Sequence, residues 1–352
     1  MPTQAKLNKE RIEPSDDPVA MPAPIIEHRT LETVFGLKGG KAAYLKVPVI
    51  INPGLHCPLM DPFYEFQEDL LRQMLLWLNG TGGKNLLAHG PTGCGKSSGF
   101  KELAARMGRE VFEGTMHARF EWSELVGQNR LTEGSTRFVY GPLPLAMKTG
   151  GILLVDEVNF TPPGQIGAMN RILDGGPLEI PETGELIAPH PAFRVAATAN
   201  AIDRDDDAVH YRGTTSMNLA FVQRFNGARV DYLTKTAEAA LLHRALPSLP
   251  GKVIEIMVAV AHDIRTSFVK GDLETTIATR ILRRWGEVLV ARLEPLLQSP
   301  EAEMVWALTF VLTNLVKRAD GEVCVGVLKR LAAGLTLTRS SASRDGAAAT
   351  PA

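Results

Sequence analysis

Short apolar segments alternate with amphipathic ones through the middle of the chain. Three of them, at 84–90, 150–157 and 193–200, carry apolar runs that end in a glycine or a polar side chain. Such runs are typical of strands that are buried on both faces of a parallel sheet. The stretch KSSGFKELAARMG, which follows the first run, spaces its apolar residues as a helix does. Strands that alternate with helices predict a three-layer αβα domain with a parallel sheet.

The pattern changes in the second half of the chain, where helix-like segments continue to about residue 335 and no strand pattern of comparable strength occurs. One helical stripe there consists of Val253, Ile256, Met257, Val260, Ala261 and Ile264. We therefore expect a small, all-helical second domain. The composition of the two ends indicates little order. The predicted organisation is a flexible N-terminal arm at 1–45, an α/β core with hairpin insertions at 46–232, a helical domain at 233–338 and a disordered tail at 339–352.

Composition narrows the class of protein. The chain has 352 residues, of which 45% are hydrophobic and 22% charged, as in ordinary globular proteins. Its net charge of −1 gives no bulk attraction for nucleic acid or an anionic membrane. Cys57, Cys94 and Cys324 are too far apart to indicate a disulfide framework or a zinc site. The N-terminus is unlike a secretory signal, and the most apolar stretch, 304–316, is too short to span a bilayer. We expect a reduced, cytoplasmic protein.

A glycine-rich loop, HGPTGCGKSS, follows the first predicted strand. Gly90, Gly95, Lys96 and Ser97 fit the phosphate-binding pattern G-x-x-x-x-G-K-[ST] between a strand and a helix. Glycines let backbone N–H groups approach phosphates, Lys96 adds a positive charge, and the Ser97 hydroxyl is the expected Mg²⁺ ligand. The predicted ATP-binding residues are Gly90, Pro91, Thr92, Gly93, Cys94, Gly95, Lys96, Ser97 and Ser98.

Polar residues end the other two predicted strands. Asp156 ends the ILLVD run and Glu157 follows it. Parallel strands bring their carboxyl ends to one edge, so Asp156 can hold Mg²⁺ beside the loop. Glu157 can orient and deprotonate an attacking water. Asn200 ends VAATAN on what should be an adjacent strand, where it can position that water with Glu157.

Taken together, these motifs resemble those of AAA+ ATPases. HGPTGCGKSS is similar to the Walker A motif, ILLVDE to Walker B, and ATAN to the sensor 1 strand, with Asn200 as the sensor. The resemblance covers about 45–335 and implies a P-loop NTPase core followed by a helical lid, with ATP and Mg²⁺ as ligands. Asn200 and Glu157 are the catalytic residues that it implies here.

Two arginines take roles through the same resemblance. NLAFVQRFN would carry the arginine finger at Arg224, and TTIATRILRRW would carry sensor 2 at Arg280, although Arg283 or Arg284 could be the sensor instead. A finger stabilises charge that develops on the γ-phosphate, and a neighbouring subunit can supply it. The family usually has an acid immediately before this arginine, whereas this chain has Gln223.

Within AAA+ proteins the chain resembles the MoxR-type branch. Its segments 122–151 and 178–193 are similar to that branch's helix 2 insertion and to its hairpin before sensor 1. The segments PHPAFRVAATAN and VP…DPFYEF resemble the ATPase subunit of aerobic cobaltochelatase more closely. The resemblance implies a hexameric homo-oligomer that remodels a protein partner, such as a von Willebrand factor A-domain protein, in metal insertion or enzyme maturation. The competing hypothesis is a nucleic-acid motor or loader with the same core, which the near-neutral charge disfavours.

Overall fold

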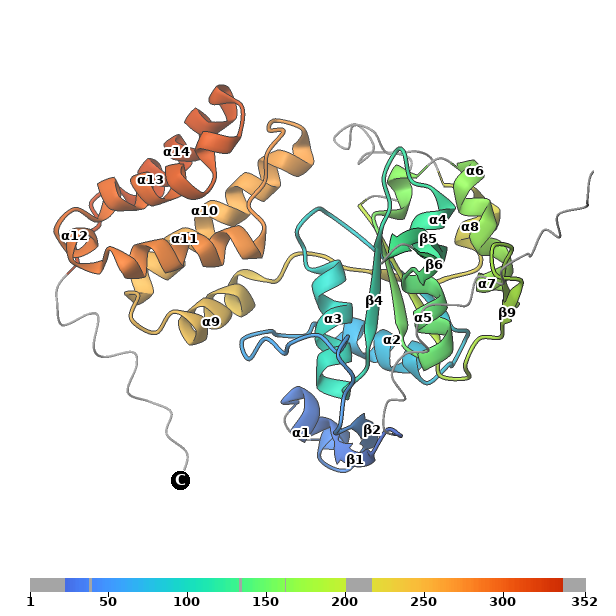
Figure 1. Cartoon of the computed structure of the whole chain (residues 1–352). Coiled ribbons are helices and arrows are strands. Elements are labelled where there is room, and N and C mark those ends of the chain that lie inside the picture. The colour runs from blue at the N-terminus through green and yellow to red at the C-terminus, as the bar shows by residue number, and fades with distance from the viewer. Residues whose placement is uncertain (1–22, 38–39, 133–134, 162, 201–216, 338–352) are drawn as a thin grey trace, which may run out of the picture.

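The computed structural model describes residues 23–37, 40–132, 135–161, 163–200 and 217–337. An α/β core and a separate group of helices make up the molecule (Figure 1). The predicted disordered tail and most of the first half of the predicted arm lie outside the described residues. Among the described residues, no helix has the length and apolarity that crossing a membrane requires.

Five parallel strands form the central sheet, in the order β11-β3-β10-β7-β4. These strands are β3 (Asn85–His89), β4 (Val111–Thr115), β7 (Ile152–Asp156), β10 (Arg194–Ala199) and β11 (Asn226–Arg229). The three apolar segments that predicted strands are β3, β7 and β10. Because β10 pairs with both β3 and β7, the residues that follow these three strands meet at one edge of the sheet.

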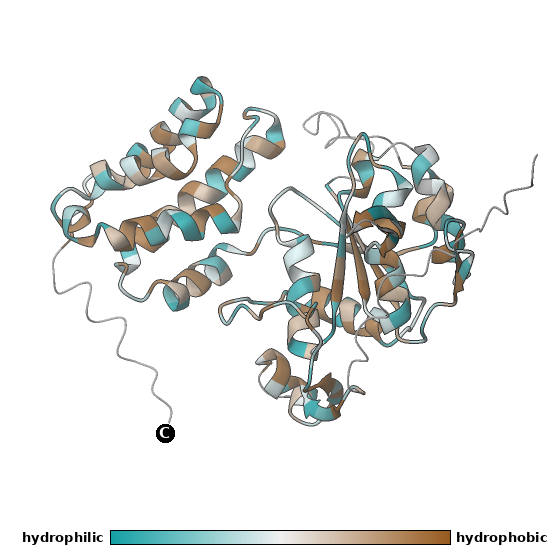
Figure 2. Ribbon diagram, viewed as in Figure 1, coloured by the Kyte–Doolittle hydropathy of each residue, from teal (hydrophilic) through white to brown (hydrophobic). Residues whose placement is uncertain are grey.

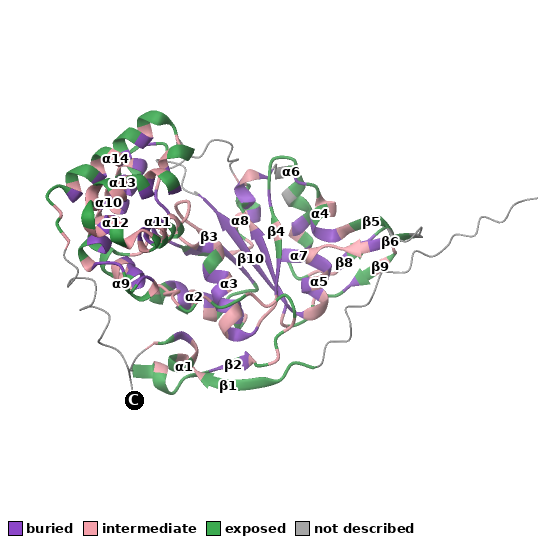
Figure 3. Cartoon of the chain, turned by 60° about the vertical axis from the view of Figure 1, so that its left-hand side comes forward, coloured by how far each residue is buried: buried purple, intermediate pink, exposed green. Residues whose placement is uncertain are grey.

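Helices cover both faces of the sheet because successive strand residues point to opposite sides. Leu86 and Ala88 of β3 pack with one group of helices, and Leu87 packs with the other. The first group is α2 (Glu68–Leu78) and α3 (Lys96–Met107), and the second is α4 (Trp122–Val126), α5 (Pro142–Thr149) and α7 (Asn170–Leu173). The three inner strands, β3, β7 and β10, are accordingly apolar in Figure 2 and buried in Figure 3. The predicted αβα core is confirmed.

Two hairpins project from the second face, as the sequence predicted. They are β5 (Gly127–Thr132) with β6 (Ser135–Tyr140), and β8 (Leu178–Ile180) with β9 (Glu185–Ile187). The Tyr140 hydroxyl donates a hydrogen bond to the Glu185 carboxylate, and Lys148 of α5 forms an ion pair with the same carboxylate at 2.9 Å. The two hairpins are therefore fixed to each other and to α5.

The predicted arm contains regular structure in its described part. Strand β1 (Ile26–Thr30) pairs antiparallel with β2 (Lys46–Ile50), and α1 (Leu31–Phe35) and a short 3₁₀ helix (Gly40–Ala43) lie between them. Phe35 is buried with residues of α2 and α3. This packing attaches the segment from Ile26 onward to the core. This ordered segment was not predicted, because the charged, proline-containing composition of the first residues does not indicate it.

The second group of helices has its own apolar core, which includes the buried Trp285. It consists of α9 (Lys235–Ala245), α10 (Gly251–Lys270), α11 (Thr279–Ala291), α12 (Leu293–Gln298), α13 (Pro300–Val311), a 3₁₀ helix (Thr313–Leu315) and α14 (Arg318–Ala332). The predicted helical stripe lies on α10, and no strand occurs in the described part of this region. The predicted helical lid is confirmed. The remaining short helices belong to the core and are α6 (Pro163–Ile166), α8 (Leu219–Val222) and the 3₁₀ helices Val158–Phe160 and Gly167–Met169.

Candidate active site

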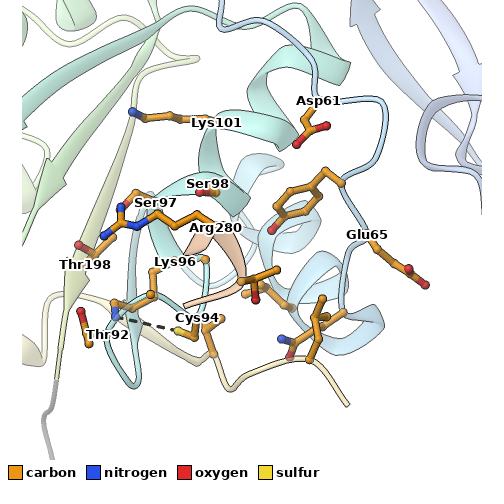
Figure 4. A pocket seen from close by; sticks show the side chains of 18 of the residues that line it. Asp61, Glu65, Thr92, Cys94, Lys96, Ser97, Ser98, Lys101, Thr198 and Arg280 are labelled. Carbon is orange, nitrogen blue, oxygen red and sulfur yellow. Dashed lines mark hydrogen bonds between the residues drawn. The ribbon is translucent and has the colours of Figure 1, made fainter. Parts of the chain in front are cut away.

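A pocket of about 420 Å³ lies where the carboxyl edge of the sheet faces the lid (Figure 4). Its walls come from the glycine-rich loop, the ends of β7 and β10, the segment before α2 and the start of α11. The predicted residues that line it are Thr92, Gly93, Cys94, Gly95, Lys96, Ser97, Ser98, Asp156, Glu157, Asn200 and Arg280. Gly90 and Pro91 contribute to the site through their backbone carbonyl groups, as the contacts of Lys96 show.

The glycine-rich loop passes close to other parts of the backbone, and two glycines make this possible. A Cβ atom at Gly90 would lie 2.0 Å from the carbonyl oxygen of Val230. A Cβ atom at Gly93 would lie 2.4 Å from Cβ of Ala278, the residue before α11. Both glycines have positive φ angles, which other residues adopt only with strain. The sequence GPTG therefore lets the loop contact both the strand β11 region and the lid.

Lys96 is buried at the first position of α3 and points into the loop. Its Nζ atom donates to the carbonyl oxygens of Gly90 at 3.0 Å and Pro91 at 2.8 Å, and to Oδ1 of Asn200 at 3.1 Å. Burial lowers the pKa of Lys96, against the nearby negative charges of the pocket. Among the described residues, no carboxylate contacts this buried ammonium group directly, which fits a polyphosphate that would supply the negative charge.

Cys94 lies in the same loop, with its Sγ atom 4.0 Å from Nζ of Lys96. Burial raises the pKa of the Cys94 thiol, although the Lys96 ammonium acts in the opposite direction. A thiol with a raised pKa is a weak nucleophile at neutral pH. Cys94 lines the pocket, and its raised pKa does not favour a role as a nucleophile.

Asp156 and Glu157 are held at the end of β7 by the neighbouring strand. The Ser97 hydroxyl donates to Oδ1 of Asp156 at 2.7 Å, and the Thr198 hydroxyl of β10 donates to the same carboxylate. The Glu157 backbone N–H donates to Oγ1 of Thr198 at 3.0 Å. Among the described residues, Glu157 is the one non-glycine residue with a clearly positive φ angle, 61°. This conformation is strained and is held by the surrounding contacts.

The donor atoms beside the loop fit a magnesium ion. A hydroxyl oxygen and a carboxylate oxygen, those of Ser97 and Asp156, lie 2.7 Å apart at the mouth of the phosphate loop. Mg²⁺ prefers hard oxygen ligands, and it usually takes one or two protein ligands and completes its shell with water and phosphate oxygens. These two residues would hold the ion.

The lid contributes two arginines to the pocket, Arg280 and Arg283, but they differ in their contacts. Arg283 donates to Oδ2 of Asp61 at 2.9 Å and to Oε1 of Glu287 at 3.2 Å. Arg284 is exposed and is not among the pocket residues. Arg280 lines the pocket near Ser97 and Thr198 in Figure 4. Of the three alternatives, Arg280 is therefore the one that remains available for a phosphate.

Arg224 does not lie in the pocket of its own chain. Its Nε and Nη2 atoms donate to the two carboxylate oxygens of Asp174 at 2.8 and 3.2 Å, and its Nη1 atom donates to the carbonyl oxygen of Ala220 at 2.6 Å. The structure thus brings together the predicted loop, carboxylates, Asn200 and Arg280, and it leaves Arg224 on another surface of the core.

Two contributions to the pocket were missed by sequence reasoning. Asp61, Phe63 and Tyr64 come from the segment before α2 and form the wall opposite the loop. Their segment, DPFYEF, carries no phosphate-site motif of its own. Thr198 lies inside an apolar run, and its role depends on the pairing of β10 with β7, which the sequence does not specify. An alternating strand pattern does place Thr198 on the same face as Asn200, and this is the one signal that could have found it.

Comparison with known proteins identifies the family of the chain. Residues 85–225 match the family model of the AAA domain, dynein-related subfamily. The chain is 27% identical over 253 residues to the aerobic cobaltochelatase subunit CobS of a Sinorhizobium species, which covers 69% of this chain and 76% of that protein. It is 30% identical over 213 residues to an uncharacterised protein of Staphylococcus saprophyticus, covering 59% of this chain and 76% of the relative.

Among solved structures, a proposed ATPase from Cytophaga hutchinsonii aligns with a TM-score of 0.41 at 16% identity, over 78% of this chain and 91% of that one. The fold assignment does not depend on it, because the strand order, the phosphate loop and the sequence relatives stand without it. On that basis the chain belongs to the AAA+ ATPases, in the dynein-related, MoxR-like branch of the family.

Proposed function

We propose that this ATPase binds ATP with Mg²⁺, hydrolyses it at an interface between identical subunits, and uses the resulting motion to remodel a protein partner. The observation that carries the proposal is a chain of hydrogen bonds at one edge of the sheet: Ser97 donates to Asp156, and Thr198 joins Asp156 to the backbone N–H of Glu157. A site that only holds a nucleotide has no need for a strained glutamate beside the metal ligand. A hydrolase does need a carboxylate there.

The residues of the loop bind and orient the substrate. Backbone N–H groups of residues 93–98 and the Lys96 ammonium hold the β- and γ-phosphates. Ser97 and Asp156 hold Mg²⁺, which when bound neutralises charge on the phosphate oxygens. The purine base would pack against the apolar part of the pocket lining, to which Phe63 and Tyr64 contribute.

The proposed chemical step uses Glu157 and Asn200. Glu157 accepts a proton from water as the water oxygen attacks the γ-phosphorus, and the bond from that phosphorus to the bridging oxygen of ADP breaks. Asn200 is held near Lys96 and positions the water. Thr198 fixes the backbone of Glu157, so that the carboxylate faces the pocket. Arg280 stabilises the γ-phosphate from the lid and links its loss to lid rotation.

Arg224 supports the proposal of a ring. It lies outside the pocket of its own chain, on the surface of the core, where a neighbouring subunit can use it. An arginine supplied in trans can raise the rate by about 10³–10⁵-fold in nucleotide hydrolases. We propose that six copies form the ring, in line with the family resemblance.

The partner is proposed from the relatives and from the charge of the chain. One relative is named as a subunit of aerobic cobaltochelatase, which suggests a role in metal insertion or in maturation of another enzyme. By the resemblance, the partner would be a cytoplasmic von Willebrand factor A-domain protein. A net charge of −1 supports a protein partner over nucleic acid, which proteins usually bind through a basic surface.

Substitution of Glu157 tests the assignment. Glu157→Gln should bind ATP with near wild-type affinity and hydrolyse it about 10²–10⁴ times more slowly, because an amide cannot accept the proton. Steady-state phosphate release and binding of a fluorescent ATP analogue measure the two effects. Glu182→Gln, at an exposed position in the turn between β8 and β9, is the matched control. Wild-type turnover by Glu157→Gln would show that the catalytic assignment is wrong.

A further inference from the structure

Arg224 is held in one orientation by contacts on two of its edges. The Nε and Nη2 atoms face the carboxylate of Asp174, and Nη1 donates to the carbonyl oxygen of Ala220. These bonds use three of the five N–H groups of a guanidinium. Among the described residues, Nη1 and Nη2 have one further N–H each that makes no hydrogen bond. The edge between these two nitrogens is the outer edge of the guanidinium, which has the fork geometry that fits two phosphate oxygens.

The ion pair between Arg224 and Asp174 contributes little to folding stability, because exposed ion pairs are weak. The side chains of Arg224 and Asp174 are 28% and 56% exposed. A free arginine side chain would lose rotamer freedom on reaching a phosphate. The Asp174 carboxylate removes that freedom beforehand.

Asn85 fixes the backbones that carry both members of the pair. It is buried at the start of β3, and its side-chain amide donates to the carbonyl oxygens of Leu173 and Arg224, at 2.9 Å each. Leu173 immediately precedes Asp174. Both hydrogens of one amide group therefore join the segment of the carboxylate to the segment of the arginine. A hydrophobic residue at this position would leave the two carbonyl groups without this contact.

We propose that Asp174 and Asn85 are positioning residues for Arg224: Asn85 sets the distance between the two segments, and Asp174 holds the guanidinium with its outer edge free for the γ-phosphate bound by a neighbouring subunit. The inference rests on the proposed function, in which Arg224 acts in trans.

The test is substitution of the exposed Asp174, which should leave the fold intact. Asp174→Ala should lower kcat for ATP hydrolysis about ten-fold or more while KM changes less than about two-fold, because a charge-assisted contact is lost at a group that acts in the transition state. Asp174→Glu should recover part of the rate. Glu179→Ala, which removes an exposed carboxylate 3.9 Å from Arg171, is the control and should match wild type.

If Asp174 instead kept Arg224 from reaching the neighbouring subunit, Asp174→Ala would raise kcat. A kcat of Asp174→Ala equal to or above the wild-type value would overturn the proposal. The unfolding temperature of Asp174→Ala should stay within about 2 °C of wild type, as expected for an exposed pair.

Mixed assemblies separate failure of this inference from failure of the proposed function. Glu157→Gln subunits are inactive but keep a fully positioned Arg224, so mixing them with Asp174→Ala subunits should raise hydrolysis per Asp174→Ala subunit. Arg224→Ala subunits mixed in the same way test the trans action itself. Rescue of Arg224→Ala, together with a wild-type rate for Asp174→Ala alone, would overturn only the positioning role. No rescue of Arg224→Ala would contradict the trans role.

Discussion

At the scale of single residues, Thr198 joins the two acidic positions of the candidate site. Its hydroxyl donates to Asp156 and accepts the backbone N–H of Glu157. The left-handed backbone of Glu157 costs on the order of 1–3 kcal/mol, so it needs fixed contacts. One hydroxyl thus joins the carboxylate proposed to hold the metal to the residue proposed to act as the base.

Thr198→Val should therefore impair catalysis more than nucleotide binding. The variant keeps the shape of the side chain but leaves the Glu157 N–H without its acceptor, which costs about 1–3 kcal/mol. We expect kcat to fall about ten-fold or more, with nucleotide affinity close to wild type. Phosphate release and nucleotide titration measure the two quantities.

Thr161→Val is the matched control for that variant. Thr161 is also buried, but its hydroxyl has no hydrogen-bond partner among the described residues. Its replacement should leave activity unchanged, and stability should stay the same or increase. Equal loss of activity in both variants would indicate a general effect of threonine removal and would contradict the role of Thr198.

The same residues show what sequence alone can give. Lys96, Ser97 and Asp156 were predictable because they lie within local motifs whose spacing follows from phosphate chemistry. Thr198 and Asp174 were not, because their roles depend on which strands pair and which loops meet. Those contacts arise from packing between distant segments.

At the scale of elements, a chain of contacts joins the phosphate loop to the lid. Tyr232 donates from its hydroxyl to the carbonyl oxygen of Thr92 at 2.7 Å, and the guanidinium of Arg265 in α10 lies 4.3 Å from the centre of the Tyr232 ring. Arg265 forms two hydrogen bonds, of 2.7 and 2.8 Å, with the buried Glu238 of α9. Glu238 also accepts a bond from Thr279, the residue before Arg280.

Tyr232→Phe should loosen this connection without breaking the lid. The variant loses the hydrogen bond to the loop, worth about 0.5–1.5 kcal/mol, together with the contact of the hydroxyl with Thr276 at 3.3 Å, and it keeps the ring beneath Arg265. The affinity for ATP should fall about two- to ten-fold, measured by titration with a fluorescent ATP analogue. Tyr44→Phe, at an exposed tyrosine, should bind ATP like wild type. Unchanged affinity in Tyr232→Phe would mean that the loop is not held through this contact.

The elements themselves were largely predictable. Apolar runs identified β3, β7 and β10, and the helical stripe identified α10, because period and burial follow directly from the pattern. Strands β1 and β2 were not predicted, since β1 is an exposed edge strand whose alternation is weak. The contacts of Tyr232 and Arg265 join segments that no local pattern connects.

At the scale of the whole molecule, the location of Arg224 predicts that activity depends on assembly. ATPase activity per subunit should rise with protein concentration over the range in which sedimentation shows oligomers, because each site would need an arginine from its neighbour. Arg224→Ala should remove the rise.

Arg171→Ala is the control for the arginine variant, since Arg171 is exposed and pairs only loosely with Glu179. It should show the wild-type dependence on concentration. Addition of DNA should not alter the rates. Constant activity per subunit from monomer to oligomer would contradict completion of the site by a neighbour.

The division into core and lid could be predicted from the change in periodicity, because a parallel sheet and a helical bundle leave different hydrophobic patterns. The surfaces used for assembly could not be predicted in this way. The local sequence around Arg224 would be the same whether or not a neighbouring subunit uses this arginine. Its distance from its own pocket became evident only in three dimensions.

Strand β3 gives the proposed assembly an order of events. Its five residues carry Asn85 at one end and lead into the phosphate loop at the other, about 13 Å away. In the proposed ring, the loop that binds a subunit's own nucleotide and the arginine that it would supply to its neighbour are thus attached to the two ends of β3, an interior strand of the sheet. If a change in bound phosphate shifts β3, the arginine supplied to the neighbour would shift too. ATP hydrolysis in one subunit would then set the time of hydrolysis in its neighbour. Hydrolysis would proceed around the ring from subunit to subunit in one direction.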